Sequence, residues 1–96
     1  MRTITSSAEY NSDIGEFWSY IRERNPDAAD AFVGQIDRVV DRLREFPNLG
    51  VGCEHLGPGI RRVRWRDYLV YDRVKDDAVE LVRLLHAKRD IEPKLF

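Results

Sequence analysis

The chain has 96 residues, of which 43% are hydrophobic, so it is long enough for one domain with a small core. Sixteen basic and seventeen acidic side chains leave a formal net charge of −1, which excludes a polybasic protein that binds nucleic acid through bulk charge. No apolar run approaches the ~18 residues of a membrane span, and the first residues lack the apolar stretch of a secretory signal. One cysteine, Cys53, cannot form an internal disulfide, so a cytoplasmic domain is expected.

The charges are unevenly distributed along the chain. Residues 1–56 carry 6 basic and 10 acidic side chains, whereas residues 57–96 carry 10 basic and 7 acidic ones. An anionic partner is therefore expected to meet the C-terminal part of the protein. No repeat or linker divides the sequence, so residues 1–96 are predicted to form a single domain.

The N-terminus is predicted to form a short strand followed by a helix. β-Branched residues favour a strand over residues 2–5. A helix is predicted over residues 7–24, because apolar side chains recur there at the spacing of one helical face. Ser6 and Glu9 have the spacing of a capping box at the start of this helix.

A second helix is predicted to follow almost at once. Asn25-Pro26 ends the first helix and caps the next, because asparagine is a good N-cap and proline suits the first helical position. Apolar residues then repeat at helical spacing as far as Phe46. With almost no linker, the two helices are expected to fold back as an antiparallel hairpin, and Trp18 and Tyr20 are interpreted as packing within it.

The second half of the chain is predicted to form three antiparallel strands. Residues 60–66 alternate in polarity, and residues 68–74 and 79–85 are rich in β-branched and apolar side chains. Short connections make these strands antiparallel neighbours. The predicted fold is therefore α+β, with an N-terminal strand and an α-helical hairpin packed on one face of a small antiparallel sheet.

Arginines dominate the first of these strands. Alternation places Arg62, Arg64 and Arg66 on one face and Val63 and Trp65 on the other. If the helices cover the apolar face, the arginines line an open face that would attract phosphate or an acidic protein. The alternative is a solvated strand face whose charges protect a sheet edge from aggregation.

Few other residues suggest chemistry. His86 is a candidate general base, or alternatively a structural histidine that hydrogen-bonds backbone at a strand end. His55 follows Cys53 and Glu54, but no second cluster completes a metal site. Asp13 and the other helix carboxylates are interpreted as solvated. The residues alone therefore indicate no catalytic constellation, no metal and no cofactor.

Several short motifs occur in order over nearly the whole chain. They are Trp18-Ser19-Tyr20-Ile21, Asn25-Pro26-Asp27-Ala28-Ala29, Phe46-Pro47-Asn48-Leu49-Gly50, Gly59-Ile60-Arg61, Tyr68-Leu69-Val70-Tyr71 with Arg73-Val74, and Leu85-His86 with Arg89-Asp90. Their order and spacing resemble the ParE toxins of the RelE/ParE superfamily. The resemblance implies a toxin of a type II toxin–antitoxin system, with an N-terminal strand, an α-hairpin and a three-stranded antiparallel sheet.

The resemblance implies a target and a partner. ParE-type toxins are associated with poisoning DNA gyrase and are neutralised by a ParD-like antitoxin. The related RelE-type toxins are ribosome-dependent endoribonucleases, and that alternative would use Arg61, Arg64, Arg73 and His86. Because the chain ends without a terminal Tyr or His, a non-enzymatic inhibitor is favoured, with no membrane contact and no sequence-specific nucleic-acid binding by itself. A folded but inactive relic is the third possibility.

The expected contact surfaces follow from the resemblance together with a packing argument. The apolar stripes of the hairpin cannot all face a three-stranded sheet, so part of them would remain for an amphipathic antitoxin helix. The antitoxin-binding candidates are Ile14, Phe17, Trp18, Ile21, Ala29, Phe32, Val33, Arg62, Arg64 and Arg66. The target-binding candidates are Arg61, Arg73, His86 and Arg89.

Overall fold

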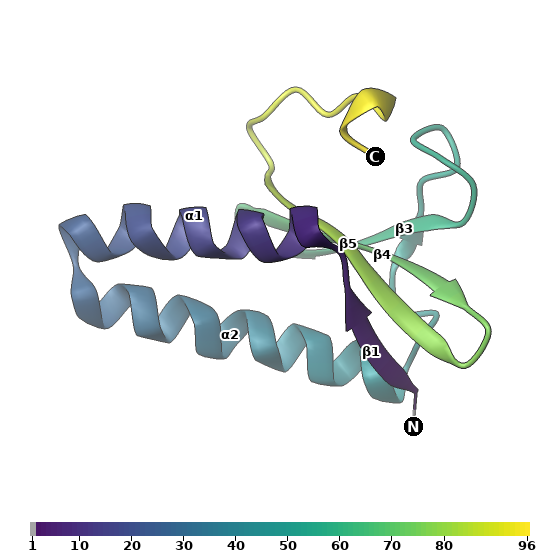
Figure 1. Ribbon diagram of the computed structural model, residues 1–96, viewed down its shortest axis with the longest axis horizontal. Coiled ribbons are helices and arrows are strands. Elements are labelled where there is room, and N and C mark those ends of the chain that lie inside the picture. Colours follow the sequence, from purple (N-terminus) through teal and green to yellow (C-terminus); the bar gives the residue numbers. More distant parts are fainter. Residues whose placement is uncertain (1) are drawn as a thin grey trace.

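The computed structural model describes residues 2–96, in which two α-helices lie on one face of a five-stranded sheet (Figure 1). The predicted α+β class is confirmed. In chain order the elements are β1 (Thr3–Ser6), α1 (Ala8–Arg24), α2 (Pro26–Glu45), β2 (Val51–Gly52), β3 (Ile60–Trp65), β4 (Tyr68–Lys75), β5 (Ala78–His86) and the 3₁₀ helix η1 (Pro93–Leu95). No helix within residues 2–96 combines the length and apolarity needed to cross a bilayer.

The sheet is mixed rather than purely antiparallel. Its strand order is β1-β5-β4-β3-β2, and β1 pairs in parallel with β5 while the other neighbours are antiparallel. The three predicted strands of the second half are present as β3, β4 and β5. Strand β2 was missed because two residues, Val51 and Gly52, are too few to show an alternating pattern.

The helix starts show which capping predictions hold. Asn25 caps α2, since its Oδ1 accepts a hydrogen bond from the backbone N–H of Ala28 at 3.2 Å, as predicted. The predicted cap of α1 is wrong by one residue. Ser6 is still paired within the sheet as the last residue of β1, so the helix begins later. Ser7 is the cap, and its Oγ accepts from the N–H of Tyr10 at 2.9 Å.

Apolar side chains fill both faces of the sheet. The helix side holds the larger core, made of Tyr10, Phe32, Ile36, Val39, Leu43, Val70, Val79, Leu81 and Leu84. The second face holds a smaller core, made of Cys53, Leu56, Ile60, Leu69, Tyr71 and Leu85. The C-terminal segment covers part of this second face, with the ring of Phe96 4.8 Å from that of Tyr71. The sequence analysis expected an open face there.

Candidate functional site

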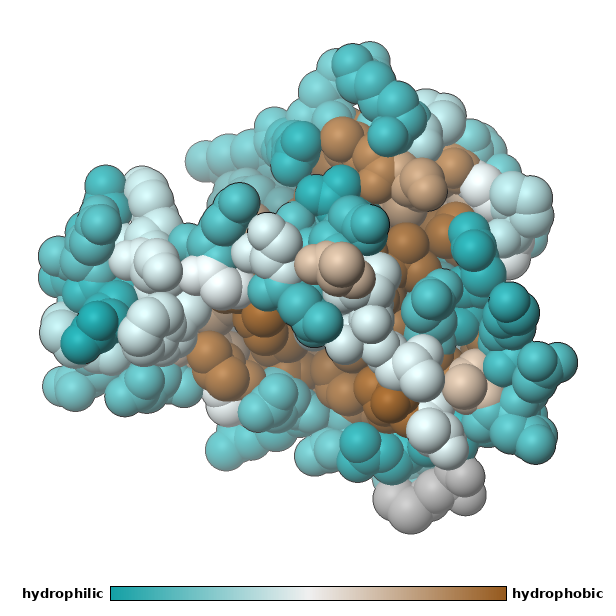
Figure 2. Space-filling model, viewed as in Figure 1, coloured by the Kyte–Doolittle hydropathy of each residue, from teal (hydrophilic) through white to brown (hydrophobic). Residues whose placement is uncertain are grey.

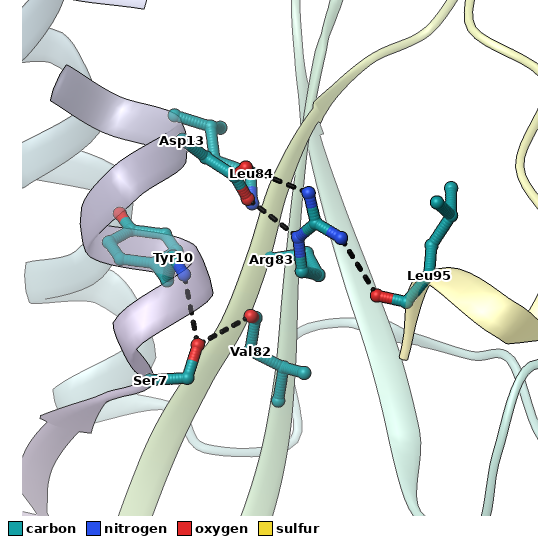
Figure 3. Close-up of polar contacts among 7 residues, drawn as sticks. All are labelled: Ser7, Tyr10, Asp13, Val82, Arg83, Leu84 and Leu95. Atoms are coloured by element: carbon teal, nitrogen blue, oxygen red, sulfur yellow. Dashed lines mark hydrogen bonds and ion pairs between the residues drawn. The ribbon is translucent and has the colours of Figure 1, made fainter. Parts of the chain in front are cut away.

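Beyond the end of β1, residues of helix α1 and its N-cap hydrogen-bond the backbone at the edge of β5 (Figure 3). Strand β1 pairs with β5 only as far as Leu81. Beyond that residue, Ser7 Oγ donates to the carbonyl of Val82 at 2.7 Å. The carboxylate of Asp13 accepts the N–H of Leu84 at 3.0 Å. Two side chains thus satisfy backbone groups that a longer β1 would have paired.

Asp13 also forms a largely buried ion pair with Arg83. The Nε and Nη2 atoms of Arg83 each donate to a carboxylate oxygen of Asp13 at 2.8 Å, and its Nη1 donates to the carbonyl of Leu95 at 2.9 Å. The hydrogen bonds to Asp13 raise the pKa of Arg83. The interpretation of Asp13 as a solvated carboxylate is therefore wrong, because helical spacing does not reveal which strand edge lies beside the helix.

A hollow of about 520 Å³ opens between α1 and the C-terminal end of β5. Its lining combines aromatic, apolar and charged side chains, and consists of Asp13, Glu16, Phe17, Tyr20, Tyr68, Leu84, His86, Lys88 and Arg89. Tyr68 contacts two neighbours edge-on, with ring centroids 5.2 Å from Phe17 and 5.4 Å from His86. Burial raises the pKa of Tyr68, with smaller contributions from Asp67 and Tyr20.

Two side chains of the hollow bear on the sequence interpretation. Tyr20 is 58% exposed and stacks under the guanidinium of Arg24 at 3.7 Å, so its predicted role in hairpin packing is wrong. His86 is half-buried, and its Nδ1 accepts a hydrogen bond from the backbone N–H of Lys88 at 3.1 Å. That contact is the one expected for a structural histidine at a strand end.

Two of the three arginines predicted on one face of β3 lie there. Arg62 and Arg64 are exposed on the second face, while Trp65 packs against the helix-side core, as predicted. The predicted position of Arg66 on the same strand face is wrong. It lies in the turn after β3 with φ of 54°, and its guanidinium sits 5.3 Å from the Trp65 ring. The left-handed backbone at Arg66 breaks the strand alternation on which the prediction relied.

Comparison with known proteins identifies the family of this chain. A family model described as "ParE toxin of type II toxin-antitoxin system, parDE" matches residues 4–91. The chain belongs to the ParE toxin family. Toxin ParE1 of Mycobacterium tuberculosis (strain CDC 1551 / Oshkosh) is 26% identical over 84 residues, covering 85% of this chain and 86% of the relative. Toxin ParE1 of Caulobacter vibrioides is 26% identical over 87 residues, covering 90% of each.

A solved structure supports the same fold. It is described as the chromosomal ParDE TA system from P. aeruginosa, and it matches with a TM-score of 0.77 at 22% sequence identity. The match covers 92% of this chain and 98% of that one. The family match over residues 4–91 confirms the resemblance inferred from the ordered motifs.

The structure separates Arg73 from His86 among the four nuclease candidates and engages Arg61 elsewhere. Nη2 of Arg61 donates to the loop carbonyls of Asn48 and Gly50 at 3.0 and 2.6 Å. Arg73 pairs with the start of β3, whereas His86 pairs with the start of β4. These positions lie five residues apart along β4, roughly 17 Å at about 3.4 Å per residue. Of the target-binding candidates, the hollow brings together only His86 and Arg89.

The apolar antitoxin candidates differ in how much surface they offer. Ala29 and Phe32 are 0% and 4% exposed, so they provide no contact surface, and Phe32 belongs to the helix-side core. Five candidates keep partial exposure, and they are Ile14, Phe17, Trp18, Ile21 and Val33. Figure 2 shows apolar surface in the trough between α1 and α2.

One buried group was not singled out from the sequence. Asp72 is fully buried, and neither of its carboxylate oxygens has a hydrogen-bond partner. Its cross-strand neighbour is Arg61. Burial raises the pKa of Asp72 to about 6, and the nearby charge of Arg61 opposes this shift. The sequence feature that could have indicated this burial is the position of Asp72, which is the one carboxylate within the apolar run 68–74.

The loop around Cys53 has a structural explanation. Cys53 is buried, with its thiol 3.6 Å from the carbonyl of Val51. The carboxylate of Glu54 accepts the N–H of Gly59 at 3.1 Å. In residues 2–96, no cluster of three histidine, cysteine or acidic side chains is arranged to hold a metal ion.

Proposed function

We propose that this ParE-type toxin inhibits DNA gyrase and blocks replication, and that a ParD-like antitoxin neutralises it. The observation that carries the proposal is the family match over residues 4–91. The similar solved structure, described as a ParDE system, supports a partner of the ParD kind. Acting on gyrase would place the toxin in the cytoplasm.

Inhibition is proposed to occur by binding rather than by catalysis. A general acid and base must lie within hydrogen-bond reach of one substrate atom. Arg73 and His86 are separated along the sheet, and the guanidinium of Arg61 is occupied by loop carbonyls. This separation favours a protein-binding toxin over the RelE-type ribonuclease.

The contact surfaces are proposed as two regions. The target would meet the basic C-terminal side of the protein, with His86 and Arg89 in the hollow and Arg61 and Arg73 on β3 and β4. The antitoxin would cover the partly exposed apolar residues of the hairpin and the exposed arginines Arg62 and Arg64. The antitoxin assignment rests on exposure and charge, since binding at a protein surface needs accessible groups. Arg61 and Arg73 are only partly exposed and are assigned to the target surface for their charge.

Inducible expression in bacteria tests the proposal. The chain is expressed with and without the product of its neighbouring gene, while growth, cell length, DNA synthesis and protein synthesis are followed. Growth arrest with elongated cells, damaged DNA and continuing translation, rescued by the neighbour, is the expected result. A purified gyrase supercoiling assay with the isolated toxin then checks the target directly.

The competing functions give different results in the same experiment. Loss of translation before loss of DNA synthesis would indicate the ribonuclease, and His86→Ala would be the next variant. Absence of arrest would indicate an inactive relic. Either result overturns the proposed inhibition of gyrase.

A further inference from the structure

A second hollow, formed by α2 and the end of β3, contains three arginines. It has a volume of about 280 Å³ and is lined by Gln35, Arg38, Val39, Arg42, Trp65 and Arg66, and we call it the arginine hollow. Its lining includes no carboxylate. Arg38, Arg42 and Arg66 are exposed, and within residues 2–96 none of them takes part in an ion pair. Their charges are therefore available to an anion from outside the chain.

The carboxylates that lie near these arginines in the sequence have other surroundings. Asp41 and Asp67 form ion pairs with arginines outside the arginine hollow, at 3.0 and 3.8 Å. Asp37 lies on a different side of α2 from the residue that follows it, since adjacent residues of a helix do not face each other. Glu45 lines the next hollow along α2 together with Arg42. One carboxylate is thus left to compete for one of the three arginines.

Trp65 holds the guanidinium of Arg66 in place. The ring of Trp65 is itself anchored, because it stacks on Tyr68 with ring centroids 6.0 Å apart and packs against the helix-side core. The guanidinium of Arg66 lies 5.3 Å from the centre of this ring. A guanidinium over an aromatic ring keeps the N–H donors at its edge available for an anion. The left-handed backbone of Arg66 therefore brings it to Trp65, away from the face that Arg62 and Arg64 share.

The spacing of the two helical arginines suits a polyanion. Arg38 and Arg42 are four residues apart on α2, so they lie on one side of the helix, about 6 Å apart along its axis. Each strand of duplex DNA presents a phosphate about every 3.4 Å along the axis. Arginines at this spacing can therefore contact phosphates of the same strand, each through paired N–H donors.

Helix stabilisation explains only part of this cluster. Basic side chains in the last turn of a helix offset its macrodipole, and α2 has Arg42 and Arg44 there. Arg38 lies before the last turn, and Arg66 lies outside the helix altogether. A role in binding accounts for all three arginines of the hollow, whereas the macrodipole accounts for one.

We propose that Arg38, Arg42 and Arg66 form a phosphate-binding site for the backbone of double-stranded DNA. The contact is independent of base sequence, because phosphates position a protein on a duplex without reporting its bases. It depends on a local cluster, so the net charge of −1 does not oppose it. The choice of DNA among polyanions rests on the proposed function, since gyrase acts on DNA, whereas the recognition of phosphate rests on the arginines.

An NMR titration of the isolated toxin with a short DNA duplex tests the site. At low salt, the indole N–H of Trp65 and the side-chain N–H groups of the three arginines are expected to shift. Arg38→Gln/Arg42→Gln is expected to bind the duplex at least about tenfold more weakly. The logarithm of affinity should fall against the logarithm of salt with a slope of about −2.7 for three phosphate contacts, and of about −0.9 in this variant.

The matched control is Arg22→Gln/Arg24→Gln on α1. It removes the same charge, and these arginines also lie against aromatic rings, at 5.1 and 3.7 Å from their centres. The hollow beside Arg22 contains Glu23, which would repel a phosphate. The control is expected to change affinity by less than about twofold. Glutamine forms helices nearly as well as arginine and all four positions are exposed, so both double variants should fold.

Three results would overturn the site. They are an unshifted Trp65 signal with DNA, an equal loss of affinity in both double variants, and equally tight binding of a polyglutamate peptide, which would indicate a surface for acidic protein instead. A separate supercoiling assay keeps the proposed function distinct. A toxin that inhibits gyrase without binding DNA would retain that function and refute this site. A toxin that binds DNA through these arginines but leaves gyrase active would do the opposite.

Discussion

The carboxylate of Asp13 on α1 holds the guanidinium of Arg83 on β5 through two hydrogen bonds of 2.8 Å. The N–H of Leu84 donates a third hydrogen bond to the same carboxylate. The side chains are only 9% and 14% exposed, so solvent screens the pair weakly. One carboxylate therefore links the first helix to the last strand, and through Arg83 to the carbonyl of Leu95.

Removing that carboxylate is expected to destabilise the fold strongly. Asp13→Ala leaves the buried Arg83 charge and the N–H of Leu84 without partners, which costs about 3–5 kcal/mol in the free energy of unfolding. Urea unfolding measures the effect. The control is Asp41→Ala, which breaks the exposed ion pair of Asp41 with Arg44 and should cost less than about 1 kcal/mol. Equal losses in the two variants would contradict a structural role for the Asp13–Arg83 pair.

Asp72 is expected to make stability depend on pH. Its folded pKa of about 6 lies above the ordinary value of 3.8, so the folded state binds the proton more tightly than the unfolded state. Stability therefore rises as pH falls from above 6 towards 4, and the cost of the buried charge is complete above pH 6. The difference corresponds to roughly 3 kcal/mol.

Asp72→Asn checks this sign. The variant is expected to be more stable than the wild type at pH 7.5 and to lose the rise in stability between pH 6 and 4. Urea titrations at several pH values give the comparison, with Asp30→Asn as the control because Asp30 is exposed on α2. An unaltered pH dependence in Asp72→Asn would show that another group titrates in this window.

Charge reversal on the second face of the sheet should weaken the antitoxin complex. Arg64→Glu is expected to lower affinity several-fold at low ionic strength, with a smaller effect as salt is added. Arg62→Glu should behave alike. Arg66→Glu is the internal comparison and should matter less, because Arg66 stacks on Trp65 at the turn. Unchanged affinity of Arg64→Glu at low salt would remove this surface from the interface.

The C-terminal segment is expected to stabilise the toxin through Phe96. Phe96→Ala removes the edge-on contact with the buried ring of Tyr71 and should cost about 1–2 kcal/mol, because Phe96 is half-buried. Thermal or urea unfolding measures the loss. Lys94→Ala, at an exposed position of η1, should be neutral, and a neutral Phe96→Ala would mean that the segment does not pack on the sheet in solution.

Local patterns were sufficient to predict most of the elements. Asn25-Pro26 carries its own stop and start signals, and the long strands show clear alternation or β-branched runs. Features that depend on distant partners were not predictable in this way. The pairing of β1 with β5 and the cover formed by residues 91–96 join segments whose association leaves no periodic trace in one sequence.

The candidate site shows the same limit. The alternation of β3 placed Arg62 and Arg64 correctly, but it failed at Arg66, where the turn begins. Asp13 and Tyr20 lie on the same helix, yet one is buried against β5 and the other is exposed. Their exposure differs because of where α1 lies relative to the end of β5. Tertiary packing sets that position, so the local sequence does not reveal it.

The parallel pairing of β1 with β5 has a consequence for synthesis. Thr3 faces Ala78 and Ser6 faces Leu81, so the residues of β1 are synthesised long before the residues with which they pair. Contacts of such large sequence separation form late and slowly. The sheet of the nascent toxin therefore cannot be completed before β5 has been synthesised. A message cut short before the codons of β5 would yield a chain in which β1, α1 and the hollow all lack their supporting strand.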